Sequence, residues 1–315
     1  MNIFLPTLNQ LAFLFSFIVI GYILMKAKLL PDNAAGVLSK LENMIFIPAL
    51  VMGTFIEEFT VEKLSTMWLP LVVSIGILVI TIPLSILLPK FITRDRYVQG
   101  IYTYGLAFSN FGFMGNAVVK GLYPELFAEY LIFQLPLWVG IYVWGVPCLL
   151  IADAGEKQSL GKKLKAFVNP MFIGLFIGII LGLLNVDLPV WLTSLIKVSG
   201  DCMSPVAMLL TGMIVSTISL KSAFTNWRTY LVSAIRLLAI PLAFVLVAVL
   251  FPALFENNET VYLCALCSLA MPLGLSTIVV PSGLGKDTTE AAGMALVSHL
   301  LSCITIPIVF MIALM

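Results

Sequence analysis

Ten apolar segments, each close to the roughly 20 residues that an α-helix needs to cross a bilayer core, fill most of this sequence. Hydrophobic residues make up 61% of the chain and charged residues 10%, whereas a soluble domain carries about 25% charged residues. Too few polar groups are present to cover a folded surface in water, so lipid must be the solvent. We therefore predict an all-α membrane protein with ten spans, at residues 7–26, 36–56, 66–89, 98–121, 126–151, 168–186, 190–217, 227–252, 260–284 and 288–314.

The basic residues of the connections favour one set of loops. The connections after the odd-numbered spans hold most of the lysines and arginines, whereas the other set holds only Lys63 and Lys120 beside several acidic residues. Loops rich in lysine and arginine stay in the cytoplasm. The pattern predicts a multi-pass protein of the cell membrane, with both termini outside and the longest loop, 152–167, inside.

The chain divides at this loop into two halves of five spans each. Lys40 precedes Pro48 by eight residues, and Lys197 precedes Pro205 by the same number. A unit with an odd number of spans reverses its direction when it is repeated, so the two halves are predicted to be inverted repeats. Transporters built in this way bind substrate near the midplane, where broken helices meet. The first repeat, the connecting loop and the second repeat are predicted at residues 1–151, 152–167 and 168–315.

Spans four and nine are rich in residues that interrupt helices. Two glycines and two asparagines fall between Asn110 and Asn116, and Pro272 and Pro281 flank Gly274. Glycine costs about 1 kcal/mol against alanine in a helix interior, and proline removes a backbone donor. The N-termini of half-helices attract anions, so we predict a site suited to a carboxylate. The candidate substrate-binding residues here are Asn110, Phe111, Gly112, Gly115, Asn116, Pro272, Gly274 and Ser276.

Charged groups at membrane depth are expensive and often functional. Asp201 lies about ten residues into span seven, roughly 15 Å deep. It is the first candidate for binding a coupling Na⁺ or H⁺, and a structural hydrogen-bond acceptor is the alternative. Glu42 and His299 are further candidates for that ion, although a lone histidine in an apolar span is more often a satisfied core residue. Arg236 in span eight would neutralise a buried acid or face an anion.

The stretch Asn110–Gly115 resembles the Asn-x-Gly-x-x-Gly pattern in the fourth span of the auxin efflux carrier family. That family includes plant PIN-type carriers and bacterial malonate and malate permeases, and this chain is similar to a bacterial member. Asn43 with Pro48, and the run from Met271 to Asp287, resemble the family's patterns as well. This chain has Ala117 where the family usually has proline.

The resemblance implies ten spans in two inverted repeats, with spans four and nine crossing as broken helices. It also implies the plan of the related bile acid/sodium symporters, in which one domain moves against a scaffold in an elevator-type alternating-access cycle. Asn43 is carried over as a substrate-site residue. Substrates in the family are mostly organic anions, and related carriers are commonly dimers, so a homodimer is a further expectation.

The sequence thus predicts a secondary active transporter for a small organic anion, such as a mono- or dicarboxylate or an auxin-like acid. A non-transporting membrane sensor of the same fold and a cation/proton antiporter are the open alternatives. No enzyme is expected, because no serine or aspartyl protease arrangement is complete. The net charge is only +1, so no nucleic-acid partner is expected. No metal site or cofactor is expected, because Cys264 and Cys267 lack a second pair or a nearby histidine.

Overall fold

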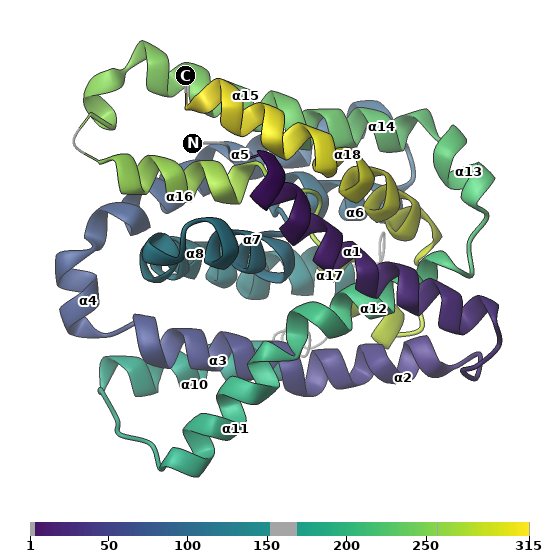
Figure 1. Ribbon diagram of the computed structural model, residues 1–315, viewed down its shortest axis with the longest axis horizontal. Coiled ribbons are helices and arrows are strands. Elements are labelled where there is room, and N and C mark those ends of the chain that lie inside the picture. The colour runs from purple at the N-terminus through teal and green to yellow at the C-terminus, as the bar shows by residue number, and fades with distance from the viewer. Residues whose placement is uncertain (1–3, 152–168, 257, 315) are drawn as a thin grey trace.

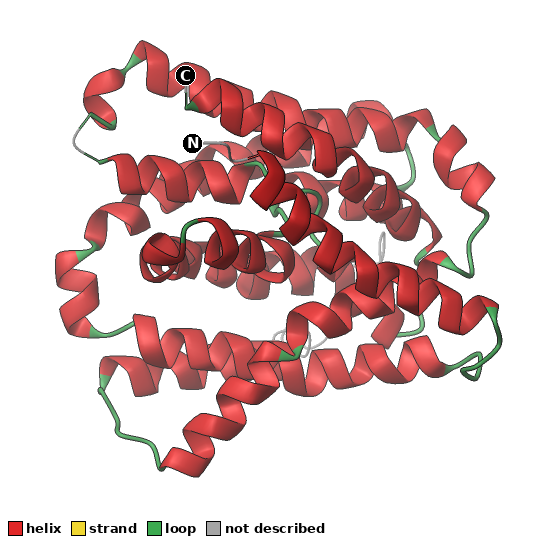
Figure 2. Ribbon diagram, viewed as in Figure 1, coloured by secondary structure: helices red, strands yellow, loops and turns green. Residues whose placement is uncertain are grey.

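The computed structural model describes residues 4–151, 169–256 and 258–314, and this part of the chain is helical almost throughout (Figure 2). No strand occurs among these residues. The predicted all-α class is therefore confirmed. The predicted connecting loop, 152–167, lies outside the described residues.

Short connections join the helices, and four of the elements are π-helical, with a turn widened by an extra residue. In chain order the elements are α1 (Phe4–Lys26), α2 (Ala34–Leu41), π-helix η1 (Glu42–Phe46), α3 (Ile47–Glu58), α4 (Val61–Thr66), α5 (Trp68–Ile92), α6 (Arg96–Ala107), π-helix η2 (Phe111–Gly115), α7 (Asn116–Leu122), η3 (Pro124–Leu126), α8 (Phe127–Gly140), π-helix η4 (Ile141–Ile151), α10 (Pro170–Leu183), α11 (Val190–Asp201), α12 (Met203–Val215), α13 (Leu220–Thr225), α14 (Trp227–Ala234), π-helix η5 (Ile235–Ala239), α15 (Ile240–Leu250), η6 (Pro252–Leu254), α16 (Glu259–Leu269), α17 (Ser276–Gly283) and α18 (Thr289–Ala313).

Several of these helical stretches are long and apolar enough to cross a membrane. Within the described ranges there are six, at Ala34–Glu58, Trp68–Ile92, Pro124–Ile151, Val190–Val215, Trp227–Leu250 and Thr289–Ala313. Of the other predicted spans, the first contains the 23-residue helix Phe4–Lys26, and the rest contain shorter helices such as Pro170–Leu183. A multi-pass arrangement follows, while the count of ten spans and their inverted repeat stay predictions.

The connections gather at two ends of the molecule (Figure 1). Both chain termini and α4 lie at one end, at the left of the view, and α13 and the turn between α1 and α2 lie at the other. This is the division that the lysine pattern predicts between the two sets of loops. We call the end with the termini and α4 the terminal end, and the end with α13 the opposite end.

Two short helices, α4 and α13, occupy connections in which no helix was predicted. Thr60 Oγ1 accepts a hydrogen bond from the Lys63 backbone N–H, and Ser219 Oγ accepts one from the Ser222 N–H. Side-chain oxygens at these positions satisfy donors that a helix start leaves unpaired. Each helix therefore starts at its own cap, which an argument from apolar length alone overlooks.

The helices pack in two groups. The first, which we call the framework, consists of α1, α2–α3, α10 and α11–α12; α1 lies along α12, and α10 and α11 lie along α3. The second, which we call the broken-helix bundle, consists of α5, α6–α7, α8–η4, α14–α15, α16–α17 and α18. Within it α5 packs on α6 and α8, and α18 packs on α14. The two groups meet where α7 and η2 contact α1 and α12, and where α17 contacts α2.

Glycines let α1 and α12 approach to backbone contact, as is common where membrane helices pack. A Cβ on Gly212 would overlap the carbonyl oxygen of Ile18 and lie 2.9 Å from the Tyr22 N. We expect Gly212→Ala to destabilise the protein by about 1–3 kcal/mol, the usual cost of overpacking, measured as a lower melting temperature in detergent. Gly76→Ala is the matched control, because a Cβ there meets nothing within 4 Å. Equal melting temperatures for the two variants would contradict the expectation.

Candidate functional site

The two segments that were predicted to break are interrupted, and the interruptions lie against each other. α6 ends at Ala107 and the next helical turn begins at Phe111, while α16 ends at Leu269 and α17 begins at Ser276. We call residues 108–110 and 270–275 together the junction.

Backbone hydrogen bonds hold the junction together. Ser109 and Leu273 form an isolated antiparallel bridge. The Asn110 N–H donates to the Pro272 carbonyl at 2.7 Å, and the Gly274 N–H donates to the Phe108 carbonyl at 3.2 Å. Backbone groups freed by the helix breaks therefore satisfy one another inside protein, as a lipid environment requires.

A partly enclosed cavity of about 350 Å³ lies between the framework and the first interrupted segment. Glu57, Lys120 and Lys197 are exposed at its rim, and Gly112 and Met203 are buried deeper within it. Since Glu57 lies at the end of α3 next to α4, the cavity belongs to the terminal end of the molecule. Its volume is in the range of small-molecule sites.

One face of η2 and α7 lines this cavity and carries groups that can donate hydrogen bonds. Gly112, Asn116 and Lys120 all line it, and their spacing of four residues places them above one another on a helix. Gly112 lies in the first turn of η2, where backbone N–H groups have no acceptor within the helix. Gln134 Nε2 donates to Asn116 Oδ1 at 2.7 Å, so the Asn116 amide keeps its own N–H donors for the cavity. The result is a ladder of backbone amide, side-chain amide and ammonium.

Gly112 is required at its position by close packing. A Cβ there would lie 2.5 Å from Cη2 of Trp138, whose ring also packs edge-on against Phe111. Only glycine lets the backbone reach the cavity beneath this aromatic ring. The glycine thus has a physical role beside breaking the helix.

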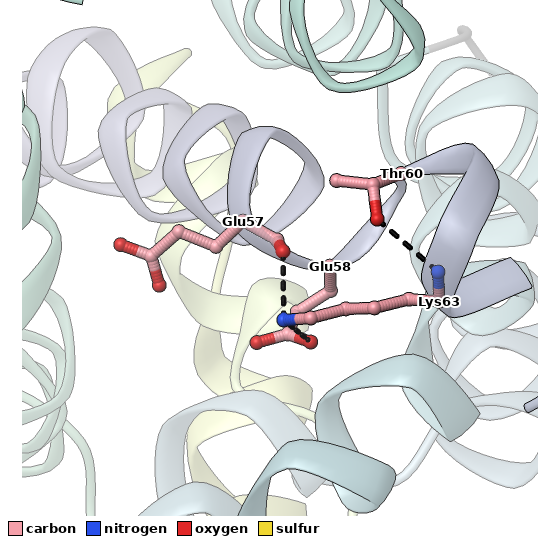
Figure 3. A network of polar contacts seen from close by, with 4 residues as sticks. All are labelled: Glu57, Glu58, Thr60 and Lys63. Carbon is pink, nitrogen blue, oxygen red and sulfur yellow. Dashed lines mark hydrogen bonds and ion pairs between the residues drawn. The ribbon is translucent and has the colours of Figure 1, made fainter. Parts of the chain in front are cut away.

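The rim of the cavity is balanced in charge, with Lys120 and Lys197 beside Glu57 and Asp201. Figure 3 shows the arrangement around Glu57, whose carboxylate points away from Lys63. The Lys63 ammonium instead donates to the Glu57 carbonyl at 2.9 Å and forms an ion pair with Glu58 at 2.8 Å. Because Lys63 is engaged by Glu58, the carboxylate of Glu57 stays at the cavity rim.

Residues 6–310 match the family described as membrane transport protein. The chain belongs to this family. It is the family of the auxin efflux carriers, so the resemblance carried by Asn110–Gly115 is confirmed. Its members are transporters rather than enzymes, which agrees with the prediction of a non-enzyme. No protein of curated function matches the sequence.

The other predicted substrate-binding residues of the transporter lie outside the cavity lining. Phe111 and Gly115 are buried in packing, with Gly115 against Met271 and the Tyr130 hydroxyl. The Pro272 carbonyl and the Gly274 N–H form hydrogen bonds with the backbone of Asn110 and Phe108 at the junction. Ser276 is buried at the start of α17. Of the nine predicted substrate-site residues, the cavity therefore brings together two, Gly112 and Asn116, while a substrate role for the others stays a prediction.

His299 lies next to the junction and has hydrogen-bond partners on both ring nitrogens. Nδ1 is 2.8 Å from the Ala295 carbonyl, and Nε2 is 2.8 Å from Asn110 Nδ2. Because a carbonyl only accepts, Nδ1 carries the proton and Nε2 accepts from the Asn110 amide. This is the geometry of a satisfied neutral histidine, and its role as an ion site stays a prediction.

Asn43 lies outside the cavity lining, at the contact between η1 and α17. Its Nδ2 donates to the Val279 carbonyl of α17 at 2.9 Å, and Ser39 Oγ donates to the same oxygen at 2.5 Å. A Cβ on Gly283 would lie 2.9 Å from Asn43 Nδ2 and 3.0 Å from Ser39 Oγ. These contacts close α17 tightly onto α2 and η1.

Glu42, next to Asn43 in η1, is fully buried. Neither carboxyl oxygen has a hydrogen-bond partner among the described residues. An isolated buried charge is very costly, so the neutral acid is the form that this environment tolerates. Asp201 differs, since it is exposed and lines the cavity.

Sequence reasoning overlooked Lys120 and Lys197 as cavity residues. They were assigned to a connection and to a polar helix start, respectively. The signal for Lys120 was its position four residues after Asn116 and eight after Gly112, which places it on the same helix face. The signal for Lys197 was its spacing to Asp201, one helical turn later. Neither pattern shows by itself that α7 and α11 face one another.

Proposed function

We propose that the transporter is a secondary active carrier of a small organic anion and works by alternating access. The observation that carries the proposal is the donor ladder of Gly112, Asn116 and Lys120 on the cavity wall. A backbone amide at a helix start, an amide side chain and an ammonium all favour a carboxylate. The cavity volume suits a small acid, such as a mono- or dicarboxylate.

The balanced charge of the rim supports selection of the anion inside the cavity rather than at its mouth. Glu57 and Asp201 offset the two rim lysines, so long-range attraction of anions is weak. Hydrogen-bond donors at Gly112 and Asn116 then discriminate a carboxylate from a neutral solute of the same size. We infer a carrier with a defined small substrate rather than a broad anion channel.

We further propose ten spans in two inverted repeats, with both termini outside the cell membrane. The matching spacing of Lys40–Pro48 and Lys197–Pro205 makes α2 the counterpart of α11. The interrupted fourth and ninth spans then make α17 the counterpart of α7. α17 is closed onto α2 by Asn43 and Ser39, whereas α7 and α11 face each other across the cavity. Equivalent pairs that differ in this way support a state open to the outside and sealed to the inside. Rocking or sliding of the broken-helix bundle along the framework, as in an elevator, would convert this state into one that is open to the inside and sealed to the outside.

A screen of carboxylic acids tests the proposal. The purified protein is heated with mono- and dicarboxylates at about millimolar concentration, and the acid that raises the melting temperature is then offered to proteoliposomes. We expect stabilisation by at least one acid and saturable uptake of the same acid. Stabilisation without uptake would favour the sensor alternative, and no response to any acid would contradict an anion site.

Lys120→Gln should weaken binding of the stabilising acid by about tenfold, because one charge-assisted hydrogen bond is lost. The measurement is the acid concentration that gives half of the maximal thermal shift. Lys90→Gln is the matched control, since Lys90 is equally exposed and lies at the end of α5, outside the cavity lining. An equal change in both variants would assign the effect to overall charge rather than to the ladder.

A further inference from the structure

The largest fully buried side chain in the described part of the transporter is an arginine. Arg236 is 1% exposed and lies in η5, midway along the stretch from Trp227 to Leu250. A guanidinium at this depth is expensive unless its N–H donors and its charge are both satisfied. The proposed function assigns it no task.

The Arg236 guanidinium binds backbone carbonyls from both interrupted segments. Nη1 donates to the Leu106 carbonyl at 3.1 Å, Nη2 donates to the Ser268 and Leu269 carbonyls at 3.3 Å each, and Nε is 3.4 Å from the Met271 carbonyl. Leu106 is in the last turn of α6, and Ser268 and Leu269 are in the last turn of α16. One side chain thus reaches the C-terminal ends of two half-helices and the junction between them.

The helix ends supply the negative charge that balances this arginine. Each helix C-terminus carries a partial negative charge on carbonyls that have no partner within the helix. No carboxylate within the described ranges pairs with Arg236; the ion pair found there joins Lys63 and Glu58. Arg236 therefore neutralises no buried acid among the described residues, and the alternative that it faces an anion stays a prediction. Its counter-charges are the ends of α6 and α16.

In transporters with broken helices, unwound carbonyls and half-helix C-termini are the groups that hold a coupling cation. We propose that Arg236 is a resident cation of the junction: it takes the place of a metal ion there and ties α6, α16 and η5 into one moving body. We then expect no coupling Na⁺ at these four carbonyls, because they already accept from the guanidinium. The statement about coupling rests on the proposed transport function, whereas occupancy of the junction by Arg236 does not.

The test uses melting temperature in detergent, so it needs no transported solute. Wild-type protein should melt within about 1 °C in NaCl, KCl and choline chloride at about 0.15 M. Arg236→Ala should melt lower by about 5 °C or more, because charged helix ends are left buried without a partner. Guanidinium at about millimolar concentration should restore part of that loss, whereas urea, which has the same shape without the charge, should restore none. Arg228→Ala, which changes an exposed arginine of α14, should melt like the wild type.

Specific stabilisation of the wild type by Na⁺ over choline would overturn the proposal. So would an Arg236→Ala variant as stable as Arg228→Ala, or one that urea rescues as well as guanidinium. If Arg236→Ala fails to fold, Arg236→Lys takes its place. Lysine keeps the charge but reaches fewer carbonyls, so we expect the melting temperature of Arg236→Lys to fall by an intermediate amount and to rise again when guanidinium is added. An unchanged melting temperature would contradict the proposal. These melting-temperature measurements can be interpreted even if no acid stabilises the protein in the anion screen, because they need no transported solute.

Discussion

Cysteines placed at Ser39 and Gly283 and then cross-linked are expected to abolish solute uptake. Gly283 of α17 lies against α2, and a Cβ on it would be 3.0 Å from Ser39 Oγ. A covalent bond between these two residues would keep α17 against α2 and so keep the molecule closed at its α13 end. Alternating access requires α17 to leave α2, so uptake into proteoliposomes should fall by at least about tenfold when such a gate is locked.

The cross-linking experiment carries its own controls. The double variant is made in a chain whose five native cysteines are replaced, and uptake is measured before cross-linking, after cross-linking and after reduction. Reduction should restore the starting rate. In each single-cysteine variant the oxidant should leave the rate of uptake unchanged. Uptake that persists in fully cross-linked protein would show that the contact between α17 and α2 does not open during transport.

Glu42→Gln is expected to leave the protein folded and to remove the response of uptake to a pH gradient. We propose Glu42 as the proton site because it is fully buried and lies beside the contact of Asn43 with α17. Neither of its carboxyl oxygens has a hydrogen-bond partner in the described part of the chain. In this state the acid is neutral. When α17 leaves α2, water would reach the carboxyl and the proton would be released on that side.

The groups around Glu42 support a proton rather than a metal ion. α17, α10 and α12, which pack near η1, carry no acidic, basic or histidine side chain. Tyr142 of η4 interacts electrostatically with Glu42. The charged residues on the other neighbouring helices are Lys40 of α2, Glu57 and Glu58 of α3, and Lys197 and Asp201 of α11. Among the described residues, no group of three His, Cys, Asp or Glu side chains could hold a metal ion, and a single carboxyl suits one proton.

The decisive comparison is between Glu42→Gln and Asp201→Asn. Imposing a pH gradient should stimulate wild-type uptake by about fivefold or more, since each pH unit contributes about 1.4 kcal/mol per coupled proton. Asp201→Asn should keep this response and Glu42→Gln should lose it, with melting temperatures close to the wild type in both. The reverse result would make Asp201 the coupling residue, as its depth in the sequence suggested. If both variants kept the stimulation by a pH gradient, neither Glu42 nor Asp201 would be the coupling residue.

Apolar length was enough to predict an all-helical membrane protein, although not the short helices α4 and α13. The composition leaves lipid as the only possible solvent, and in lipid a chain without a closed barrel must be helical. Glycine, asparagine and proline likewise predicted that the fourth and ninth spans are interrupted, since these residues act on the backbone locally, although α6 and α16 stop a few residues earlier than the clusters. Local effects of this kind can be read from neighbouring residues in the sequence.

Residues that act through distant partners were decided by the tertiary structure. Asn43 and Asn110 looked alike as polar residues at membrane depth, yet one binds α17 and the other binds His299. Arg236 lies more than 100 residues along the chain from Leu106, one of the residues whose carbonyls it binds. The sequence determined that two helices must break inside a membrane. Which side chain satisfies the exposed ends, and which face stays open as a cavity, depends on packing between the halves, because helix ends attract any donor or cation that the fold brings within reach.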